Sequence, residues 1–349
     1  MTPHAITAPP ADCFAAYPAS WYLFGESREL TGQPLTRRVL GRDLVAFRTS
    51  RGAVSILDAH CSHLGADLGL GRVVGDAIQC PFHNWTYAAD GQCIAIPGAQ
   101  RIPAFARQPC YPVEERHGYV FFFNGTEALF PLPFFVGADP GEFAASRPFR
   151  YVADCSWYMN AAHAFDTQHF LAVHDRELVA PPETDRPAPF ARRNSYRAKV
   201  LGKTRLDRWL RSIAGDMVNI TITVWGGTFV LVTGDFDRAR SRFIITTRPL
   251  EDGTTLCEGI VFGPRGPSAL ARALTPTALR IRRFFTYGYL LDETTRLRGT
   301  RYQPASLGPP DRDMIEFFQW AASLPQNPHE RGSAGAGGEG TLRLQAATR

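Results

Sequence analysis

The chain carries two short Cys/His segments, Cys61-Ser62-His63-Leu64-Gly65 and Cys80-Pro81-Phe82-His83-Asn84-Trp85. Sixteen residues separate His63 from Cys80, which is enough for a strand hairpin between the two segments. Gly, Pro and Asn favour a turn at both places. Each turn offers one thiol and one imidazole, so the sequence predicts that the two turns together hold one metal site.

The mixture of ligands in each turn indicates which metal the site takes. Two Cys and two His suit tetrahedral zinc, or a [2Fe–2S] cluster in which two His bind one of the irons. Zinc sites usually group like ligands, in Cys-x2–4-Cys and His-x3–5-His pairs. Here the thiols can bind one iron and the imidazoles the other, as in a Rieske centre. We therefore assign Cys61, His63, Cys80 and His83 to a Rieske [2Fe–2S] cluster, with structural zinc as the alternative.

A second group of possible ligands lies downstream, in Asp166-Thr167-Gln168-His169-Phe170-Leu171-Ala172-Val173-His174. On a helix Asp166 and His169 share a face, because residues three apart are neighbours. His174 is five residues beyond His169, so the helix must bend or end before the two imidazoles can meet. Two His and a carboxylate from elsewhere would form the facial triad of a non-haem Fe(II) site with open positions. A one-electron cluster in the same chain favours this interpretation over two ordinary polar helix residues.

The two motifs, in this order, resemble those of Rieske non-haem iron oxygenase α subunits, over about residues 20–325. The resemblance implies an α+β fold: an N-terminal all-β Rieske domain, then a helix-grip-like catalytic domain with a central antiparallel sheet. We expect an N-terminal arm over 1–20, the Rieske [2Fe–2S] domain over 21–126, the mononuclear iron domain over 127–328 and a disordered tail over 329–349.

The resemblance also implies roles for the ligand candidates. In this family the subunits form rings, and the cluster of one chain faces the mononuclear iron of its neighbour. Asp166 would be the catalytic residue that bridges His63 or His83 of the adjacent subunit and His169. His169 and His174 would bind the mononuclear iron.

The third iron ligand of the family is an Asp on a late helix. We assign it to Asp292, with Glu293 and Asp313 as the alternatives. The chain departs from many relatives at His163, because they carry Asn three residues before the bridging Asp. Asn160, one helical turn earlier, is a candidate for that role, and the role of His163 stays open.

Two further features bear on the electron chemistry. Ala66 and Phe82 stand where respiratory Rieske proteins carry an extra pair of Cys, so the resemblance implies the lower-potential oxygenase type. It also implies electrons from a ferredoxin or a ferredoxin reductase. The segments 58–93 and 166–174 resemble those of an arylamine N-oxygenase of secondary metabolism. That similarity is strongest in the domain that does not contact substrate, so it leaves the substrate open.

Composition limits the other partners. The net charge is +5, from 38 Lys+Arg against 33 Asp+Glu, without the basic run and interleaved aromatics that nucleic-acid binding requires. No segment approaches the ~18 apolar residues of a membrane span, and no signal peptide is recognisable. Five of the seven Cys lie outside the cluster and are most simply unpaired thiols. We therefore expect a cytoplasmic protein without nucleic-acid or membrane partners.

The function expected from the resemblance is that of a Rieske mono- or dioxygenase. It would use O2, Fe(II) and electrons that come indirectly from NAD(P)H to oxidise a small apolar or aromatic substrate, by hydroxylation, dealkylation or N-oxidation, as a homotrimer. Apolar content points to 217–233 and 287–291 as substrate-facing segments, and the individual substrate-binding residues are left open. The alternative is a Rieske electron carrier or iron–sulfur sensor with no mononuclear iron.

Periodicity in the second half predicts helices over 157–174, 267–297 and 311–323, around strands between 195 and 261. The Pro-rich, charged segment 179–192 is expected to be a mobile loop.

Overall fold

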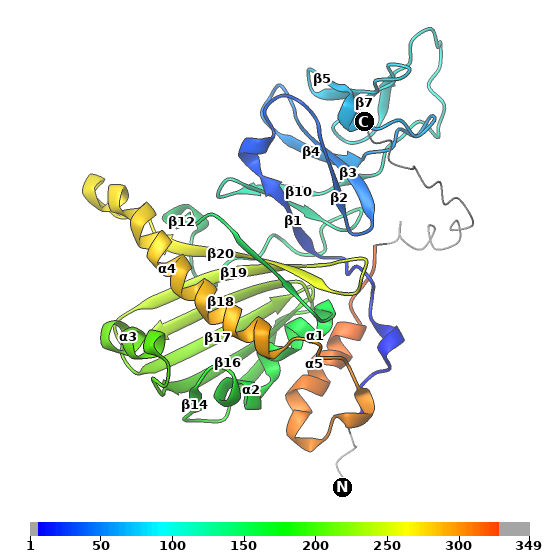
Figure 1. Cartoon of the computed structure of the whole chain (residues 1–349). Coiled ribbons are helices and arrows are strands. Elements are labelled where there is room, and N and C mark those ends of the chain that lie inside the picture. Colours follow the sequence, from blue (N-terminus) through cyan, green and yellow to red (C-terminus); the bar gives the residue numbers. More distant parts are fainter. Residues whose placement is uncertain (1–5, 328–349) are drawn as a thin grey trace, which may run out of the picture.

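A computed structural model describes residues 6–327, apart from the side chains of Leu206 and Asp292. The tail predicted to be disordered, 329–349, lies outside the described residues. The described chain forms an all-β domain followed by an α+β domain (Figure 1). None of its helices combines the length and the hydropathy that crossing a bilayer requires.

The N-terminal domain is built from three small antiparallel sheets, with strand orders β1-β11-β10, β2-β3-β4-β9 and β5-β6-β7-β8. The Cys61 segment lies just before the third sheet, and the Cys80 segment joins β6 to β7. The strands are β1 (Trp21–Glu26), β2 (Leu35–Val39), β3 (Arg42–Arg48), β4 (Val54–Asp58), β5 (Arg72–Val74), β6 (Ala77–Gln79), β7 (Thr86–Ala88), β8 (Cys93–Ala95), β9 (Cys110–Tyr111), β10 (Val113–Arg116) and β11 (Tyr119–Phe123).

The C-terminal domain contains one nine-stranded antiparallel sheet, in the order β12-β20-β19-β18-β17-β16-β14, with β13 on β20 and β15 on β16. The strands are β12 (Phe143–Ala145), β13 (Phe149–Ala153), β14 (Arg176–Leu178), β15 (Glu183–Ala188), β16 (Ala191–Val200), β17 (Met217–Trp225), β18 (Phe229–Phe236), β19 (Arg240–Pro249) and β20 (Thr255–Pro264). The helices are α1 (Trp157–Ala162), the 3-10 helix η5 (His163–Phe165), α2 (Thr167–Ala172), α3 (Arg205–Ala214), α4 (Ala269–Arg296) and α5 (Arg312–Ala322). Helix α4 runs across one face of the sheet (Figure 1).

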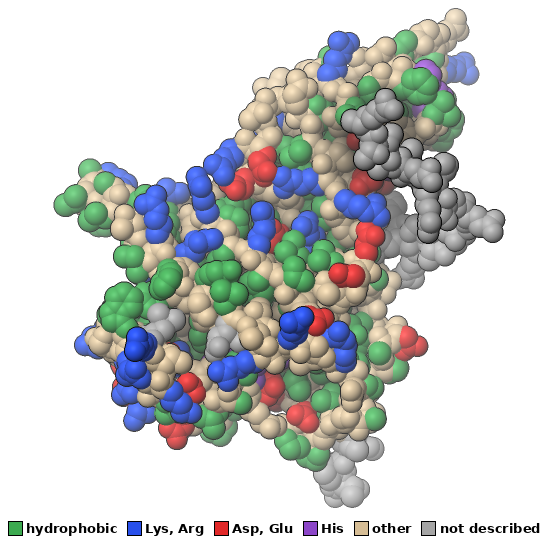
Figure 2. Space-filling view, in the orientation of Figure 1, with side chains coloured by type: hydrophobic (Ala, Val, Ile, Leu, Met, Phe, Trp, Pro, Cys, Tyr) green, Lys and Arg blue, Asp and Glu red, His purple; other side chains and the backbone are tan. Residues whose placement is uncertain are grey.

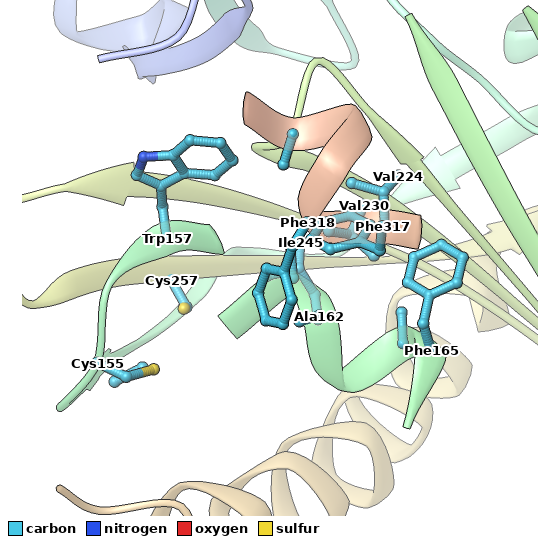
Figure 3. Close-up of a cluster of buried hydrophobic side chains, with 14 of the residues drawn as sticks. Cys155, Trp157, Ala162, Phe165, Val224, Val230, Ile245, Cys257, Phe317 and Phe318 are labelled. Carbon is cyan, nitrogen blue, oxygen red and sulfur yellow. The ribbon is translucent and has the colours of Figure 1, made fainter. Parts of the chain in front are cut away.

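The two faces of the sheet pack against different partners, because successive residues of a strand point to opposite sides. On β18, Val230 joins a core with α1 and α5, in which Phe317 and Phe318 of α5 are fully buried (Figure 3). Phe229 points the other way, into a core shared with Trp21 and Phe121 of the N-terminal domain. The domains are therefore joined by apolar packing through the sheet.

Three local features differ from the expected elements. The helix expected over 157–174 is broken into α1, η5 and α2. The segment 179–192, expected to be a loop, contains β15, whose charged residues pair with β16 at the outside of the sheet. A short helix, α3, was not expected; it is capped by the Thr204 hydroxyl, which accepts from the N–H of Asp207. Charged edge strands and short capped helices carry little apolar periodicity, so the pattern missed both.

The shared core predicts a large stability effect at Phe229, which is 1 % exposed and lies 6.0 Å from the Phe121 ring. We expect Phe229→Ala to lower the free energy of unfolding by about 3–5 kcal/mol, because it leaves a cavity between the domains. Chemical denaturation of the metal-loaded protein measures the change. Val136→Ala is the control, because Val136 is 84 % exposed and should change stability by less than about 0.5 kcal/mol. Equal effects of the two variants would contradict the shared core.

Candidate metal centres

The two Cys/His segments of the N-terminal domain fold into loops with the same hydrogen bonds. In each loop the N–H of the Cys donates to the carbonyl five residues on, at 2.9 Å for Cys61 and 2.8 Å for Cys80. The carbonyl of the Cys accepts from the N–H four residues on, which belongs to Gly65 in one loop and Asn84 in the other. Both of these residues have positive φ, which Gly and Asn adopt at low cost. The sequence therefore shapes two matching turns, each with a Cys at its base.

The thiols and the imidazoles of these loops differ in their exposure to solvent. Cys61 and Cys80 are buried, and the sulfur of Cys61 lies close enough to Cys80 to influence its ionisation. His63 and His83 are exposed, with ring centroids 4.8 Å apart. Figure 2 shows histidine side chains at the surface of the end of this domain that is furthest from the large sheet, beside hydrophobic side chains. This arrangement fits a two-iron cluster whose thiolate-bound iron lies inside and whose imidazole-bound iron lies at the surface.

Hydrogen-bond donors surround the sulfurs. The Tyr87 hydroxyl lies 3.1 Å from Cys61 Sγ and 2.9 Å from the Ser62 hydroxyl. Burial raises the pKa of the Cys80 thiol, while the N–H groups of Phe82 and His83 oppose that effect. Donors aimed at a buried sulfur stabilise its thiolate form, which is the form that binds iron. Tyr87 belongs to neither Cys/His motif, so the sequence pattern alone does not indicate this contact.

The second candidate centre begins at Asp166, where the chain leaves η5 and enters α2. The Asp166 carboxylate accepts hydrogen bonds from the N–H of Gln168 at 3.0 Å and of His169 at 3.2 Å. These bonds cap α2, because the first N–H groups of a helix have no partner within it. Asp166 itself is partly exposed. It therefore fixes the start of the helix that carries His169 and still has access to the surface.

The end of α2 brings the second imidazole back. The helix ends at Ala172, before His174, as the five-residue spacing predicted. Asp175 then takes a positive φ, and the buried Arg176 holds the bend by donating to the His174 carbonyl at 2.7 Å. The His169 and His174 ring centroids lie 4.5 Å apart.

A carboxylate from α4 completes the group. The oxygens of Glu293 lie 3.6 Å from His169 Nε2 and 3.8 Å from His174 Nε2, and all three ligand atoms fall within 4.8 Å of one another. Tyr289, one turn earlier on α4, stacks on the His174 ring at 4.1 Å. Glu293 was an alternative to Asp292 in the sequence. The side chain of Asp292 is not described, so its assignment stays a prediction, and Asp313 is not part of this group.

Burial disfavours the charged form of every group at this centre. It raises the pKa of Glu293 to about 7. It lowers the pKa of His169 to about 4 and that of His174 to about 2, the latter with help from the charge of His169. The imidazoles are therefore neutral at pH 7 and do not form ion pairs with Glu293. Neutral imidazole and carboxylate are the forms that bind a divalent metal, and a cation would offset the desolvation of the carboxylate. The residues fit a mononuclear iron.

A pocket opens beside this group, with about 630 Å³ of space that no atom fills, its open mouth included. Its floor is apolar and comes from alternate residues of three strands: Ile220, Ile222, Val230, Val232, Phe243 and Ile245. Its other walls come from Tyr151 of β13, from α1, η5, α2 and α4, and from His174 just after α2. The segments expected to face substrate, 217–233 and 287–291, both line this pocket, whereas the contribution of β19 was not expected.

Comparisons with known proteins agree with the N-terminal domain as a Rieske domain. Residues 20–109 match the family described as the Rieske [2Fe-2S] domain. Aminopyrrolnitrin oxygenase PrnD of Pseudomonas fluorescens is 38% identical over 172 residues, which are 46% of this chain and 47% of that protein. The oxygenase component of 3-ketosteroid-9-alpha-monooxygenase of Rhodococcus rhodochrous is 39% identical over 114 residues, 32% of this chain and 30% of that protein.

The fold extends the likeness to the C-terminal domain. The solved structure of the NdmA QL mutant of Pseudomonas putida CBB5 with caffeine superposes with a TM-score of 0.63 at 19% identity, over 87% of this chain and 89% of that one. The chain therefore carries a Rieske [2Fe-2S] domain, and its fold is similar to that of the NdmA structure. The Rieske domain implies a [2Fe–2S] cluster. The chain spans about half the length of the first curated relative, so mononuclear iron, the use of O2 and the activity belong to the proposed function.

The contact between Tyr87 and Cys61 predicts a change in the reduction potential of the cluster. A hydrogen bond to a ligand sulfur favours the reduced, more negative cluster. We expect Tyr87→Phe to lower the midpoint potential by roughly 20–65 mV, which corresponds to the loss of about 0.5–1.5 kcal/mol in a one-electron couple. Potentiometric titration followed by EPR measures the shift.

The matched control for that variant is Tyr111→Phe in the same domain. The Tyr111 hydroxyl donates to Asp58 at 2.7 Å rather than to a ligand sulfur. It should therefore leave the midpoint potential unchanged. A shift of the same size in both variants would mean that the hydroxyl at Tyr87 does not act on the cluster.

Replacing Glu293 and replacing Asp292 should have different effects on the iron content of the protein. From the position of Glu293, we expect Glu293→Ala to reduce iron from three per chain to two while the visible spectrum of the cluster is retained. Asp292→Ala should keep three irons, because Glu293 still completes the facial triad. Elemental analysis with sulfide quantitation measures both. If Asp292→Ala instead lost the third iron, the ligand would be the residue that the sequence first indicated.

Proposed function

We propose that this chain is the oxygenase component of a Rieske system, which uses O2 and electrons from a ferredoxin or its reductase to oxidise a small apolar or aromatic molecule. One observation carries the proposal: His169, His174 and Glu293 meet within 4.8 Å, in a chain that also has a Rieske domain. An electron carrier or sensor would have no use for this second group of buried ligands.

The candidate ligands and the residues around them would have the following roles. Cys61, His63, Cys80 and His83 would hold the cluster, and His169, His174 and Glu293 the mononuclear iron. When bound, the cluster supplies single electrons and the iron supplies open positions for dioxygen. Tyr289 fixes the ring of His174 by stacking on it. The aliphatic side chains of β17, β18 and β19 keep water away from the substrate and orient it beside the iron.

Electron delivery requires a second copy of the chain. The cluster loops flank β5 and β7 at one end of the molecule, whereas the iron site lies among α2, α4 and the large sheet at the other end (Figure 1). The exposed His63 and His83 are flanked by Leu64 and Phe82, which are 66 % and 62 % exposed. An apolar rim around exposed imidazoles suits docking on another chain. We therefore propose a homotrimer, in which Asp166 of one copy meets His63 or His83 of the next.

The chemistry of the pocket supports an apolar or aromatic substrate. Its floor has no charged side chain, and the polar groups come from Tyr151 of β13 and from the helical segments and the bend around the candidate ligands. The names of similar proteins include aminopyrrolnitrin and a 3-ketosteroid, and a solved structure of similar fold holds caffeine. Hydroxylation, dealkylation and N-oxidation all suit such ring compounds. The five Cys outside the cluster form no disulfide in the described chain, which supports a reducing, cytoplasmic setting.

The decisive experiment combines iron analysis with turnover. Purified protein with a surrogate ferredoxin and reductase is offered a panel of ring compounds under labelled dioxygen. The proposal requires three irons per chain and label in a product that depends on substrate, reductant and protein. Two irons per chain with a reducible cluster and no labelled product would favour the electron carrier instead.

If Asp166 is the bridge between the cluster and the iron, its loss should stop turnover while the cluster can still be reduced. We expect Asp166→Asn to keep a reducible cluster and the α2 cap, because the Asn side chain still offers an oxygen to the N–H groups of Gln168 and His169. Loss of the carboxylate should nevertheless abolish turnover. Stopped-flow reduction and product formation are measured on the same sample, with iron analysis as the control for folding. Full turnover with normal coupling would show that Asp166 is not the bridge.

A further inference from the structure

The first half of α4 has two apolar faces. One of them contains Leu279, which is buried beside Gly263 of β20. The other contains four residues that are 53–72 % exposed, namely Leu270, Leu274, Ile281 and Phe284. These four are spaced by four, seven and three residues, so they share one side of the helix. A surface helix needs a single apolar face for its own packing, so the second face is available to a partner.

Helix α3 widens this exposed face. The Trp209 ring of α3 lies 4.9 Å from the Phe285 ring of α4, measured between centroids. Trp209 and Ile213 are both 53 % exposed. Figure 2 shows hydrophobic side chains along the surface that α3 and α4 present. An exposed apolar patch that spans two helices marks a binding surface. We call it the outer apolar face, and it consists of Leu270, Leu274, Ile281, Phe284, Trp209 and Ile213.

Arginines surround the outer apolar face. Over residues 205–214 and 269–291, the two helices carry seven Arg and one acidic residue, Asp207, which is paired with Arg176 at 2.9 Å. A hollow between the first half of α4 and β12 is lined by five arginines and by no acidic side chain. None of these five forms an ion pair within the described residues; they are Arg147, Arg265, Arg272, Arg280 and Arg283. The surroundings of the outer apolar face are therefore positively charged.

We propose that the outer apolar face docks on the surface of an anionic lipid bilayer. Anionic lipids match both properties of this surface, because their acyl chains accept the apolar side chains and their phosphates attract the arginines. Two copies paired through this face would instead set arginine against arginine. Figure 1 shows the first turns of α4 extending past the large sheet, where a flat partner can reach them. The proposal revises the expectation of no membrane partner, which followed from the absence of an apolar span.

Vesicle co-sedimentation of the metal-loaded protein tests the proposal without any turnover. We expect binding to vesicles of phosphatidylcholine with phosphatidylglycerol, and binding at least about tenfold weaker to phosphatidylcholine alone. Added salt should weaken the binding, because it screens exposed charges. Soluble glycerol 3-phosphate at the same phosphate concentration should not displace the protein, since it offers no acyl chains.

Two matched pairs of variants assign the contact. Phe284→Ser should weaken binding about tenfold, because it removes an inserted aromatic side chain, whereas Val136→Ser at an exposed position elsewhere should not. The double variant Arg272→Gln/Arg280→Gln should weaken binding about thirtyfold, at about 1 kcal/mol for each cation near the lipid. Arg28→Gln/Arg51→Gln makes the same change of net charge at exposed positions of the N-terminal domain and should have little effect. The cluster spectrum and the iron content of each variant verify folding.

Three outcomes would overturn the inference. The first is a lack of binding to the anionic vesicles. The second is an equal loss of binding in the two double Arg variants, which would mean that net charge acts and the location does not. The third is a Phe284→Ser variant that still binds vesicles but changes its oligomeric state in light scattering, which would make the outer apolar face an interface between copies.

Discussion

Removal of three ionisable side chains from water is the constraint around which the C-terminal domain is organised. The His169 and His174 side chains are each 4 % exposed and that of Glu293 is 19 % exposed. Desolvation holds both imidazoles neutral and raises the pKa of the carboxyl, so mutual ion pairing does not offset the burial. A divalent cation would offset it, because it binds neutral imidazole and favours the ionised carboxylate. Such a group stays assembled only if its elements are held from outside. Arg176 holds the bend after α2, and apolar packing holds α4 on the sheet.

In the N-terminal domain, by contrast, part of the candidate ligand group lies at the surface. Two matching turns bury the thiols and leave the imidazoles exposed, so the sulfur side of the cluster lies in the protein and the imidazole side faces outward. Asp166 has the corresponding position on the other domain: it is partly exposed, and its backbone bonds tie it directly to the helix of His169. A contact between two copies of the chain requires that the cluster imidazoles and Asp166 are both exposed. It does not require them to lie close together within one chain.

Much of this arrangement is encoded locally, and the exceptions have a common cause. The cluster ligands follow from the Cys/His spacing, and the sheet follows from alternating apolar residues, since turns and strands depend on neighbouring residues. The local pattern could not decide whether Asp292 or its neighbour Glu293 is the candidate metal ligand. Which of them faces the imidazoles depends on the rotation of a 28-residue helix, which tertiary packing sets. The contact between Tyr87 and Cys61 likewise joins residues 26 apart. The charged strand β15 was missed because its stability comes from pairing with β16 rather than from its own pattern.

The break between α1 and α2 sets the relative position of two imidazoles that line the pocket. A continuous helix would place His163 and His169 six residues apart on different faces, because residues share a face at spacings of three or four. The cap at Asp166 starts a new helix instead, and the two rings stack. Both rings line the pocket, and His169 also belongs to the compact group of candidate ligands. Any change that shifts the break moves both rings together. The spacing of this segment therefore sets the position of the candidate ligand relative to the pocket wall that His163 forms, and the two cannot be altered independently.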